Sequence, residues 1–297
     1  MINKTAMIAI VGRPNVGKST LTNALVGEKI AIVTNKPQTT RNRIFGIVNS
    51  GETQIILMDT PGFHKARTRL GDYMVRVVNE TVSDVDAVML LVEPVNNIGT
   101  QERLLMDKIR ESCVPAILVI NKIDTVRKEE LLAVIKTYSD AFDFDGIIPI
   151  SARKGDGVQL LTEELKKYAV ESHALFPEDM TTDQPEKQVC AEIIREKLLM
   201  CLEREIPHGT AVEITRFIQR EDDVIELDAT IYCEKQSHKG MIIGKGGEML
   251  KKVGELSRKD IEKYMGNKVY MQTWVKVKEN WRDSSAQLRN FGYDGEN

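Results

Sequence analysis

A short segment near the amino terminus constrains the fold of this chain more than any other feature. Residues 12–19 read G-R-P-N-V-G-K-S, which fits the G-x-x-x-x-G-K-[ST] pattern of a phosphate-binding loop. An apolar, strand-like run at 6–11 precedes the loop, and a segment with helical periodicity at 18–26 follows it. A glycine-rich turn without a ligand is the alternative interpretation, and this context disfavours it. The sequence therefore predicts a phosphate site between a strand and the amino terminus of a helix.

The positions of this loop have distinct predicted roles. Glycines let the backbone turn so tightly that successive N–H groups face phosphate oxygens. Lys18 is predicted to reach the outer phosphates, and the Ser19 hydroxyl is predicted to bind Mg²⁺. The other residues that we assign to nucleotide binding here are Gly12, Arg13, Pro14, Asn15, Val16, Gly17 and Thr20.

Residues 6–168 alternate short apolar runs with amphipathic, helix-like segments. The strand-like runs are 6–11, 44–48, 54–58, 87–92, 116–120 and 146–150. This alternation predicts an α/β fold with a mostly parallel, six-stranded sheet covered by helices on both faces. A short polar turn joins the runs at 44–48 and 54–58, which predicts one antiparallel edge.

A polar, proline-containing stretch divides the chain. It predicts a first domain at 1–170, a linker at 171–186 and a smaller α+β domain at 187–281. The pattern of the second domain is helix, strand, strand, helix, glycine loop, helix and strand. The remaining residues, 282–297, form a tail, which we expect to be frayed or weakly docked from residue 284 onward.

The composition is that of a soluble globular protein, with 42% apolar and 29% charged residues. The net charge of −3 excludes a polycation, so any nucleic-acid surface must be a local patch. The apolar runs are too short to span a bilayer, and the first residues lack the architecture of a signal peptide. The four cysteines have no metal-binding spacing. We therefore expect a cytoplasmic protein with reduced thiols. We also expect no stable oligomer.

Two further motifs follow predicted strands and indicate which nucleotide the site binds. In the D-x-x-G segment at 59–62, Asp59 is predicted to hold Mg²⁺, and the Gly62 N–H is predicted to approach a γ-phosphate. In the N-K-x-D segment at 121–124, the Asp124 carboxylate is suited to accept two hydrogen bonds from guanine. Adenine lacks those donors and would leave the carboxylate unpaired. Asn121 and Lys122 are predicted to brace the base and the phosphate loop.

Ser151 and Ala152, at the end of the last predicted strand, are expected to supply the remaining guanine contact through the Ala152 N–H. Each motif is short and weak by itself. In this order, each at a strand end, they together predict a site for GTP and GDP.

A second glycine loop, at 244–247, reads G-K-G-G and lies between two helical segments. A G-x-x-G loop with basic flanks is typical of KH domains, where it clamps about four unpaired nucleotides. A tight turn between helices is the alternative interpretation. Trp274 and Trp281 are further candidates for base stacking, although we expect core or interface packing for them. The residues that we assign to RNA binding are Lys239, Ile242, Ile243, Gly244, Lys245, Gly246, Gly247 and Lys251.

Over essentially its whole length, the chain resembles the Era-like class of GTPases that carry a carboxy-terminal type II KH domain. The segments that carry the resemblance are 38–41, 59–64, 121–124, 151–155 and 244–247. The resemblance implies a GTPase that acts in bacterial ribosome assembly, with the 3′ end of 16S rRNA and the 30S subunit as partners. It also implies peripheral contact with the inner face of the cell membrane, for which no basic amphipathic helix here argues strongly.

The resemblance also implies catalytic roles. It favours Thr40 over Thr39 as the second hydroxyl ligand of Mg²⁺, and it makes Asn15 a candidate ligand for K⁺. We therefore name Lys18, Thr40 and Asn15 as catalytic candidates, with Mg²⁺ and K⁺ as cofactors. Phe63 stands where many GTPases have the glutamine that orients water, which predicts slow intrinsic turnover. His64 is an alternative general base, but a surface histidine is the favoured interpretation.

Two other functions remain open from the sequence. A signalling GTPase would use residues 187–280 as a protein-interaction domain. A small-molecule kinase would also need a phosphate loop, but the N-K-x-D segment at 121–124 disfavours it.

Overall fold

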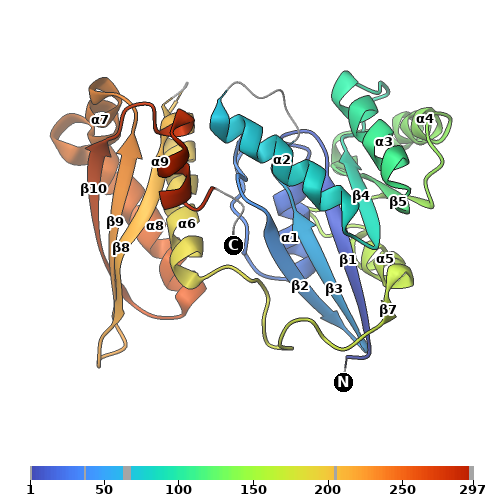
Figure 1. Ribbon diagram of the computed structural model, residues 1–297, viewed down its shortest axis with the longest axis horizontal. Coiled ribbons are helices and arrows are strands. Elements are labelled where there is room, and N and C mark those ends of the chain that lie inside the picture. Colours follow the sequence, from blue (N-terminus) through green and yellow to red (C-terminus); the bar gives the residue numbers. More distant parts are fainter. Residues whose placement is uncertain (1, 37, 63–67, 204–205, 294–297) are drawn as a thin grey trace. The chain divides into compact units, whose positions relative to one another are not determined.

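The computed structural model describes residues 2–36, 38–62, 68–203 and 206–293 (Figure 1). These residues form two compact units. The first unit comprises described residues within Met1–Ala31, Thr40–Ala66 and Met74–Asp183. The second comprises described residues within Ile32–Thr39, Arg67–Tyr73 and Gln184–Asn297. Residues 32–39, which we expected to belong to the first domain, therefore cluster with the second unit.

The first unit is built on a sheet with the order β2-β3-β1-β4-β5-β6, and a short β7 also pairs with β1. Neighbours along this order are parallel except β2 and β3, which pair antiparallel as predicted. β7 is antiparallel to β1. The strand bounds are β1 Lys4–Val11, β2 Ile44–Ser50, β3 Thr53–Asp59, β4 Ala87–Val92, β5 Ala116–Ile120, β6 Gly146–Pro149 and β7 Val170–Glu171.

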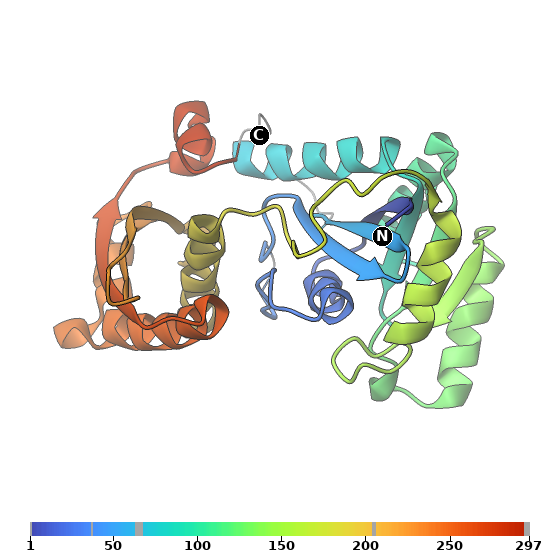
Figure 2. The same cartoon turned by 90° about the horizontal axis from the view of Figure 1, so that it is seen from below.

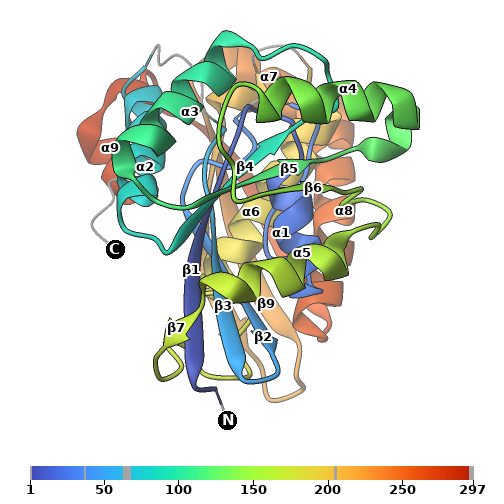
Figure 3. The ribbon, with the colours of Figure 1, turned by 90° about the vertical axis from the view of Figure 1, so that its right-hand side faces the viewer.

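Helices cover both faces of this sheet, which confirms the predicted architecture (Figure 3). One core contains side chains of α1 and α5, and the other contains side chains of α2, α3 and α4. All residues of β3, β4 and β5 are buried because both faces of these strands are covered. The helix bounds are α1 Lys18–Val26, α2 Arg69–Ser83, α3 Thr100–Ser112, α4 Lys128–Ser139 and α5 Val158–Leu165.

The parallel strands place the sequence motifs at one edge of the sheet. The phosphate loop follows β1, the D-x-x-G segment follows β3, and the N-K-x-D segment follows β5. The Ser151 segment follows β6. Parallel strands end at the same edge, and this edge is where open α/β sheets bind ligands.

The expected linker packs on the first unit over part of its length. The Ile47 N–H donates to the Thr181 carbonyl at 2.9 Å, and Asn49 Nδ2 donates to the Glu178 carbonyl at 2.7 Å. An isolated bridge also joins Gly46 to Thr182. The first unit therefore includes this segment as far as Asp183.

The second unit has a three-stranded sheet in the order β10-β9-β8, which can be followed with its helices in Figure 2. β8 and β9 are antiparallel, whereas β9 and β10 are parallel. The order of elements is the one predicted, with the glycine loop between α7 and α8. The bounds are α6 Glu186–Cys201, β8 Ala211–Gln219, β9 Ile225–Cys233, α7 Gln236–Ile243, α8 Glu248–Met265 and β10 Val269–Val277.

Residues after β10 are folded rather than frayed, so the expectation of a weakly docked tail is wrong for 285–293. Helix α9, Ser285–Asn290, buries Leu288. Trp281 is fully buried, and its ring meets the Phe291 ring edge-on with centroids 5.3 Å apart. Tyr293 is also buried. Among the described residues, no helix combines the length and the apolar character that crossing a bilayer requires.

Candidate nucleotide site and RNA groove

The phosphate loop is held in shape by contacts with a neighbouring loop of the first unit. Gly17 has a φ of 102°, and a Cβ at this position would lie 2.3 Å from Asn121 Nδ2. Only glycine satisfies both the left-handed backbone and this close approach. Asn121 Nδ2 donates to the Val16 carbonyl at 2.9 Å. The two predicted motifs are therefore joined directly.

Lys18 is buried within the phosphate loop. Its ammonium donates to the carbonyls of Gly12 at 3.1 Å and Arg13 at 3.0 Å. Burial lowers the pKa of Lys18 to about 8, and the nearby carboxylate of Asp59 partly opposes this shift. A polyanion in the loop would favour the charged ammonium. The lysine is thus poised to bind phosphate oxygens.

Three oxygen-bearing side chains meet beside Lys18. Ser19 Oγ lies 2.8 Å from Thr40 Oγ1 and donates to Asp59 Oδ2 at 2.8 Å. Asp59 is fully buried, and its Oδ1 has no hydrogen-bond partner among the described residues. Burial raises the pKa of this carboxyl to about 6, although Lys18 opposes the shift.

This arrangement suits a hard divalent cation. Mg²⁺ prefers oxygen ligands and binds proteins through one or two side chains together with substrate phosphates. The unpartnered Oδ1 of Asp59 offers a buried acceptor, and the two hydroxyls can rotate their lone pairs toward an ion. The structure brings together the three residues that we predicted as Mg²⁺ ligands: Ser19, Thr40 and Asp59.

The predicted guanine loops also converge. Ser151 Oγ donates to Asp124 Oδ1 at 2.8 Å, and this bond lowers the pKa of the Asp124 carboxyl. Asp124 is therefore ionised and able to accept hydrogen bonds from a base. The Ala152 N–H donates to Asn121 Oδ1 at 3.0 Å, so in this structure it is already used within the protein. Its contact with guanine stays a prediction.

The other loop residues vary in how the structure places them. A Cβ on Gly62 would lie 2.8 Å from Pro14 Cα, so the D-x-x-G segment approaches the phosphate loop closely. Asn15 is exposed and has a left-handed φ of 66°. The predicted roles of Phe63 and His64 lie outside the described residues.

Two acidic residues near the phosphate loop were missed by the sequence analysis. Glu93 pairs with Lys122, whose ammonium also donates to the Asn15 carbonyl at 2.7 Å. Glu102 is almost fully buried and pairs with Arg13. Glu93 directly follows β4, so its position at a strand end was a usable signal. Glu102 carried no signal, because an acidic residue in the first turn of a helix is common.

The second glycine loop is open where the first is packed. Gly246 and Gly247 have φ values of 61° and 85°, and a Cβ at either position would meet no atom within 4 Å. Lys245 and Gly246 are exposed at the tip of the loop. The loop precedes α8, so its backbone N–H groups lie at the amino terminus of an 18-residue helix. Such a terminus attracts phosphate groups.

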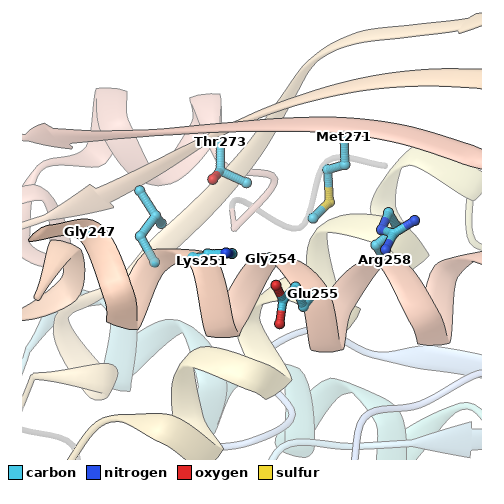
Figure 4. Close-up of a pocket in the computed structure, with 8 residues that line it drawn as sticks. Gly247, Lys251, Gly254, Glu255, Arg258, Met271 and Thr273 are labelled. Atoms are coloured by element: carbon cyan, nitrogen blue, oxygen red, sulfur yellow. The ribbon is translucent and has the colours of Figure 1, made fainter.

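A groove of about 430 Å³ runs from this loop along α8, as Figure 4 shows. Helix α8 forms one wall, and the edge strand β10 forms the other. Lys251 and Arg258 supply positive charge, whereas Glu255 supplies one carboxylate. The full lining is Gly247, Leu250, Lys251, Gly254, Glu255, Arg258, Met271 and Thr273.

The groove differs in part from the predicted RNA surface. Gly247 and Lys251 line it, as expected. Ile242 is fully buried in the core of the second unit, so its side chain does not form a surface for bases. Ile243 is partly buried against the same core. The apolar lining comes instead from Leu250 and Met271, which the sequence analysis missed.

Two family models match the chain. The model described as 50S ribosome-binding GTPase matches residues 7–122, and the KH domain model matches residues 205–282. These matches cover the phosphate and guanine motifs up to Lys122, and the whole sheet of the second unit with its glycine loop.

Similar proteins align along the entire chain. GTPase Era of Ruminiclostridium cellulolyticum is 50% identical over 293 residues, which cover 99% of this chain and 98% of that protein. GTPase Era of Alkaliphilus metalliredigens is 48% identical over 295 residues, which cover 99% of this chain and 100% of that protein.

Two solved structures share this architecture. Era in complex with MgGDPNP and nucleotides 1506–1542 of 16S ribosomal RNA has a TM-score of 0.94 and 35% identity, covering 98% of this chain and 99% of that one. A variant of Aquifex aeolicus Era bound to GDP and AlF₄⁻ has a TM-score of 0.93 and 36% identity, with the same coverage. With its phosphate loop, guanine motifs and KH groove, this chain belongs to the GTPase Era family.

Proposed function

We propose that this chain is a GTP-hydrolysing switch that binds the 3′ region of 16S rRNA and assists assembly of the 30S ribosomal subunit. The proposal rests on one observation above all. A guanine-type phosphate site and a basic single-strand groove occur in one chain that aligns over its full length with Era. We assign GTP chemistry to residues 1–170 and RNA binding to 187–281, with 171–186 as the connecting segment.

The reaction is in-line attack of water on the γ-phosphorus of GTP, which gives GDP and phosphate. Lys18 would place its ammonium against the β- and γ-phosphate oxygens and neutralise charge that develops there. The backbone N–H groups of the loop would hold the phosphates in a fixed orientation. Ser19, Thr40 and Asp59 would hold Mg²⁺, which would supply positive charge that stabilises the negative charge developing on the phosphates.

Selectivity for guanine follows from the charge state and placement of Asp124. Its carboxylate accepts from Ser151 through one oxygen, which fixes the orientation of the side chain. The Lys154 ammonium lies 3.8 Å from the other oxygen, Oδ2, and the remaining lone pairs of the carboxylate would accept from N1–H and the exocyclic amine of guanine. Adenine would leave this carboxylate unpaired, at a cost of about 1–3 kcal/mol or more.

We propose that K⁺ accelerates the reaction through Asn15. This side chain is exposed at a left-handed turn of the phosphate loop, beside the carbonyl that Lys122 anchors. A monovalent cation at this turn would stabilise charge on the leaving group much as an arginine finger does. Equal GTPase rates in potassium and sodium buffers would contradict this role.

The groove between α8 and β10 suits unpaired RNA. Gly246 and Gly247 leave the loop surface open, so a sugar–phosphate backbone can approach the protein main chain. Lys245, Lys251 and Arg258 lie where phosphates would pass. Leu250 and Met271 provide apolar surface for the bases.

We further propose a cytoplasmic site of action, because the proposed partner is ribosomal RNA. Any contact with the inner face of the membrane would then be peripheral, and no stable oligomer is required. A fractionation experiment tests this location: the protein is expected with ribosomal particles, and recovery in the membrane fraction alone would contradict it.

The competing function is a signalling GTPase whose second unit binds proteins. The groove chemistry favours RNA over this alternative because Lys251 and Arg258 line the groove next to its apolar residues, and charged residues are depleted at the cores of protein interfaces. Crosslinking distinguishes the two functions. RNA attached to peptides that contain Lys245 supports the proposal, whereas protein crosslinks alone at this loop contradict it.

The main experiment is a GTPase assay with and without a fragment of the 16S rRNA 3′ region, in K⁺ and in Na⁺. We expect slow turnover that changes when RNA is present and is faster in K⁺. Wild-type protein that hydrolyses GTP but neither binds the fragment nor responds to it would contradict the proposed function.

A further inference from the structure

The edge strand β10 presents aromatic side chains on the face that the groove does not use. Side chains alternate along a strand, so Met271 and Thr273 face the groove while their neighbours face the opposite side. Tyr270, Gln272 and Trp274 are all exposed on that side. The exposed fractions of Tyr270 and Trp274 are 52% and 44%.

These aromatic residues are not packed in the core as Trp281 is, although the Arg220 guanidinium lies 5.7 Å from the centroid of the Tyr270 ring. Trp281 is fully buried, and its Nε1 donates to the Gly209 carbonyl at 2.9 Å. We expected core or interface packing for both tryptophans: core packing is confirmed for Trp281, whereas Trp274 is not in the core. An exposed tryptophan and an exposed tyrosine on the same strand face form an unusual surface, because large aromatic rings favour burial or a ligand.

The chemistry of this face favours a nucleic-acid strand. Aromatic side chains on an open sheet stack on bases in several families of RNA-binding domain. Tyr270 and Trp274 are four residues apart, which corresponds to about 13 Å along a strand. Gln272 lies between them, and its Nε2 donates to the Tyr270 hydroxyl at 3.1 Å. Its amide is thus held beside the Tyr270 hydroxyl.

The charges on β10 itself would not repel the phosphates of an RNA strand. The strand contains no acidic residue, and Lys276 is exposed on the aromatic face. The facing row of β9 carries two carboxylates, Glu226 opposite Tyr270 and the half-buried Asp228 opposite Gln272. Glu226 pairs with Arg216 and Arg220, so its charge is compensated, whereas Asp228 adds one negative charge that phosphates on this face would avoid.

Continuity with the groove identifies the occupant. β10 is the last strand of its sheet, so a chain leaving the groove needs to cross only one strand to reach the opposite face. We propose that single-stranded RNA held in the groove continues over the edge of β10, where Trp274 and Tyr270 stack on further bases. This inference rests on the proposed RNA-binding function and extends its binding site beyond the four nucleotides of a KH clamp.

The test compares two single-stranded oligoribonucleotides of the 16S 3′ region, about four and about twelve nucleotides long. Truncation of a stacking aromatic costs roughly 5- to 150-fold in affinity. We expect Trp274→Ala and Tyr270→Ala each to weaken binding of the long RNA within this range and to leave the short RNA unchanged. Equal affinities of wild type and both variants for the long RNA would overturn the inference.

Ile218→Ala is the matched control. Ile218 is 48% exposed on β8, the opposite edge strand, and lies in the same row of the sheet as Tyr270. We expect its loss to leave both RNA affinities unchanged. An equal loss from Ile218→Ala would overturn a path along β10, because it would implicate the whole face.

Tryptophan fluorescence gives an independent readout. The chain has two tryptophans, and Trp281 is shielded from solvent. Stacking on a base quenches indole emission, so the long RNA should quench wild-type fluorescence and the short RNA should not. Trp274→Phe should remove the quenching while retaining most of the affinity, since phenylalanine also stacks. Quenching that persists in Trp274→Phe would contradict the inference.

Gly246→Asp distinguishes failure of the proposed RNA groove from failure of its extension over β10. If this variant binds both RNAs as tightly as wild type, the proposed groove fails. If it weakens both RNAs while the aromatic variants show no dependence on RNA length, the groove stands and the β10 extension alone fails. A protein occupant of the aromatic face predicts this second outcome.

Discussion

The two glycine loops of this chain differ in what surrounds their glycines. In the phosphate loop, a Cβ on Gly17 would collide with the side-chain amide of Asn121. In the RNA loop, a Cβ on Gly246 would meet nothing within 4 Å. Both glycines have left-handed backbones, so the backbone strain of a substitution is similar. The difference lies in packing. The phosphate loop is shaped by its neighbours before a ligand binds, whereas the RNA loop presents an open surface.

The largest difference in GTP affinity is expected between two single variants that carry the same glycine-to-alanine substitution, one in each loop. Gly17→Ala should reduce GTP affinity at least about 100-fold, because the added methyl displaces Asn121 from the Val16 carbonyl. Gly246→Ala should cost only about 1–2 kcal/mol in stability, from its left-handed backbone, and should leave GTP affinity unchanged. Calorimetric titration with GTP and thermal melting measure both. Similar GTP affinities in the two variants would contradict the claim that packing around Gly17 shapes the phosphate loop.

Asp124→Asn sharpens the account of the packed site. The variant replaces an acceptor-only carboxylate with an amide that cannot accept both hydrogen bonds of guanine. We expect GTP affinity to fall about 100- to 1,000-fold. Xanthosine triphosphate serves as the control, because its carbonyl replaces the exocyclic amine and can accept from the new amide. An unchanged preference for GTP over this analogue would argue against Asp124 as the base-reading residue.

Asp59→Asn tests how much folding stability the protein loses by burying the charged Asp59 carboxylate in the phosphate site. The pKa of Asp59 is about 6 when folded and 3.8 in its ordinary state, so the folded protein disfavours the charged carboxylate. This penalty is present above pH 6 and disappears as the pH falls toward 3.8. We expect the ligand-free variant to be about 1–3 kcal/mol more stable than wild type at pH 7.5, and less so at pH 5. Urea unfolding at both pH values measures this difference.

The same variant should lose Mg²⁺-dependent GTP hydrolysis, because an amide is a poorer ligand than a carboxylate. A gain in stability with a loss of activity would identify Asp59 as strained for function. A destabilised variant at pH 7.5 would contradict this interpretation.

The smallest effect belongs to the open groove. Lys251→Ala should weaken RNA binding about 3- to 10-fold and reduce the slope of log affinity against log salt by about one. Lys252→Ala is the matched control, since this exposed neighbour does not line the groove. Affinity measured at several salt concentrations distinguishes them. Equal losses would indicate a diffuse electrostatic surface rather than a groove.

The packed site was more predictable from sequence than the open one. Strand ends fix where Asp59, Asn121 and Asp124 lie, because parallel strands deliver their following residues to one edge. The ion pair of the buried Glu102 with Arg13 was not predictable, since nothing in the local pattern indicates which acidic residue contacts the loop.

The open groove was predictable only at its glycines. Helical spacing places Leu250, Gly254 and Arg258 on the same face of α8 as Gly247, and this signal was available in the sequence. The roles of Ile242 and Met271 depend on how α7 and β10 pack against the core, which the local pattern does not determine. The exposure of Trp274 follows from β10 being an edge strand with one open face, which is a property of the whole sheet.

The most direct test is whether one negative charge placed in the second glycine loop weakens RNA binding without changing GTP binding. Gly246→Asp and Gly246→Asn have nearly the same shape, and both side chains tolerate left-handed backbones. Affinities of both variants are measured for GTP and for the fragment of the 16S rRNA 3′ region. We predict that Gly246→Asp binds RNA at least about tenfold more weakly than Gly246→Asn, because its carboxylate repels phosphates, while both bind GTP as wild type does. Equal RNA affinities of the two variants, or a loss of GTP binding in either, would contradict the account.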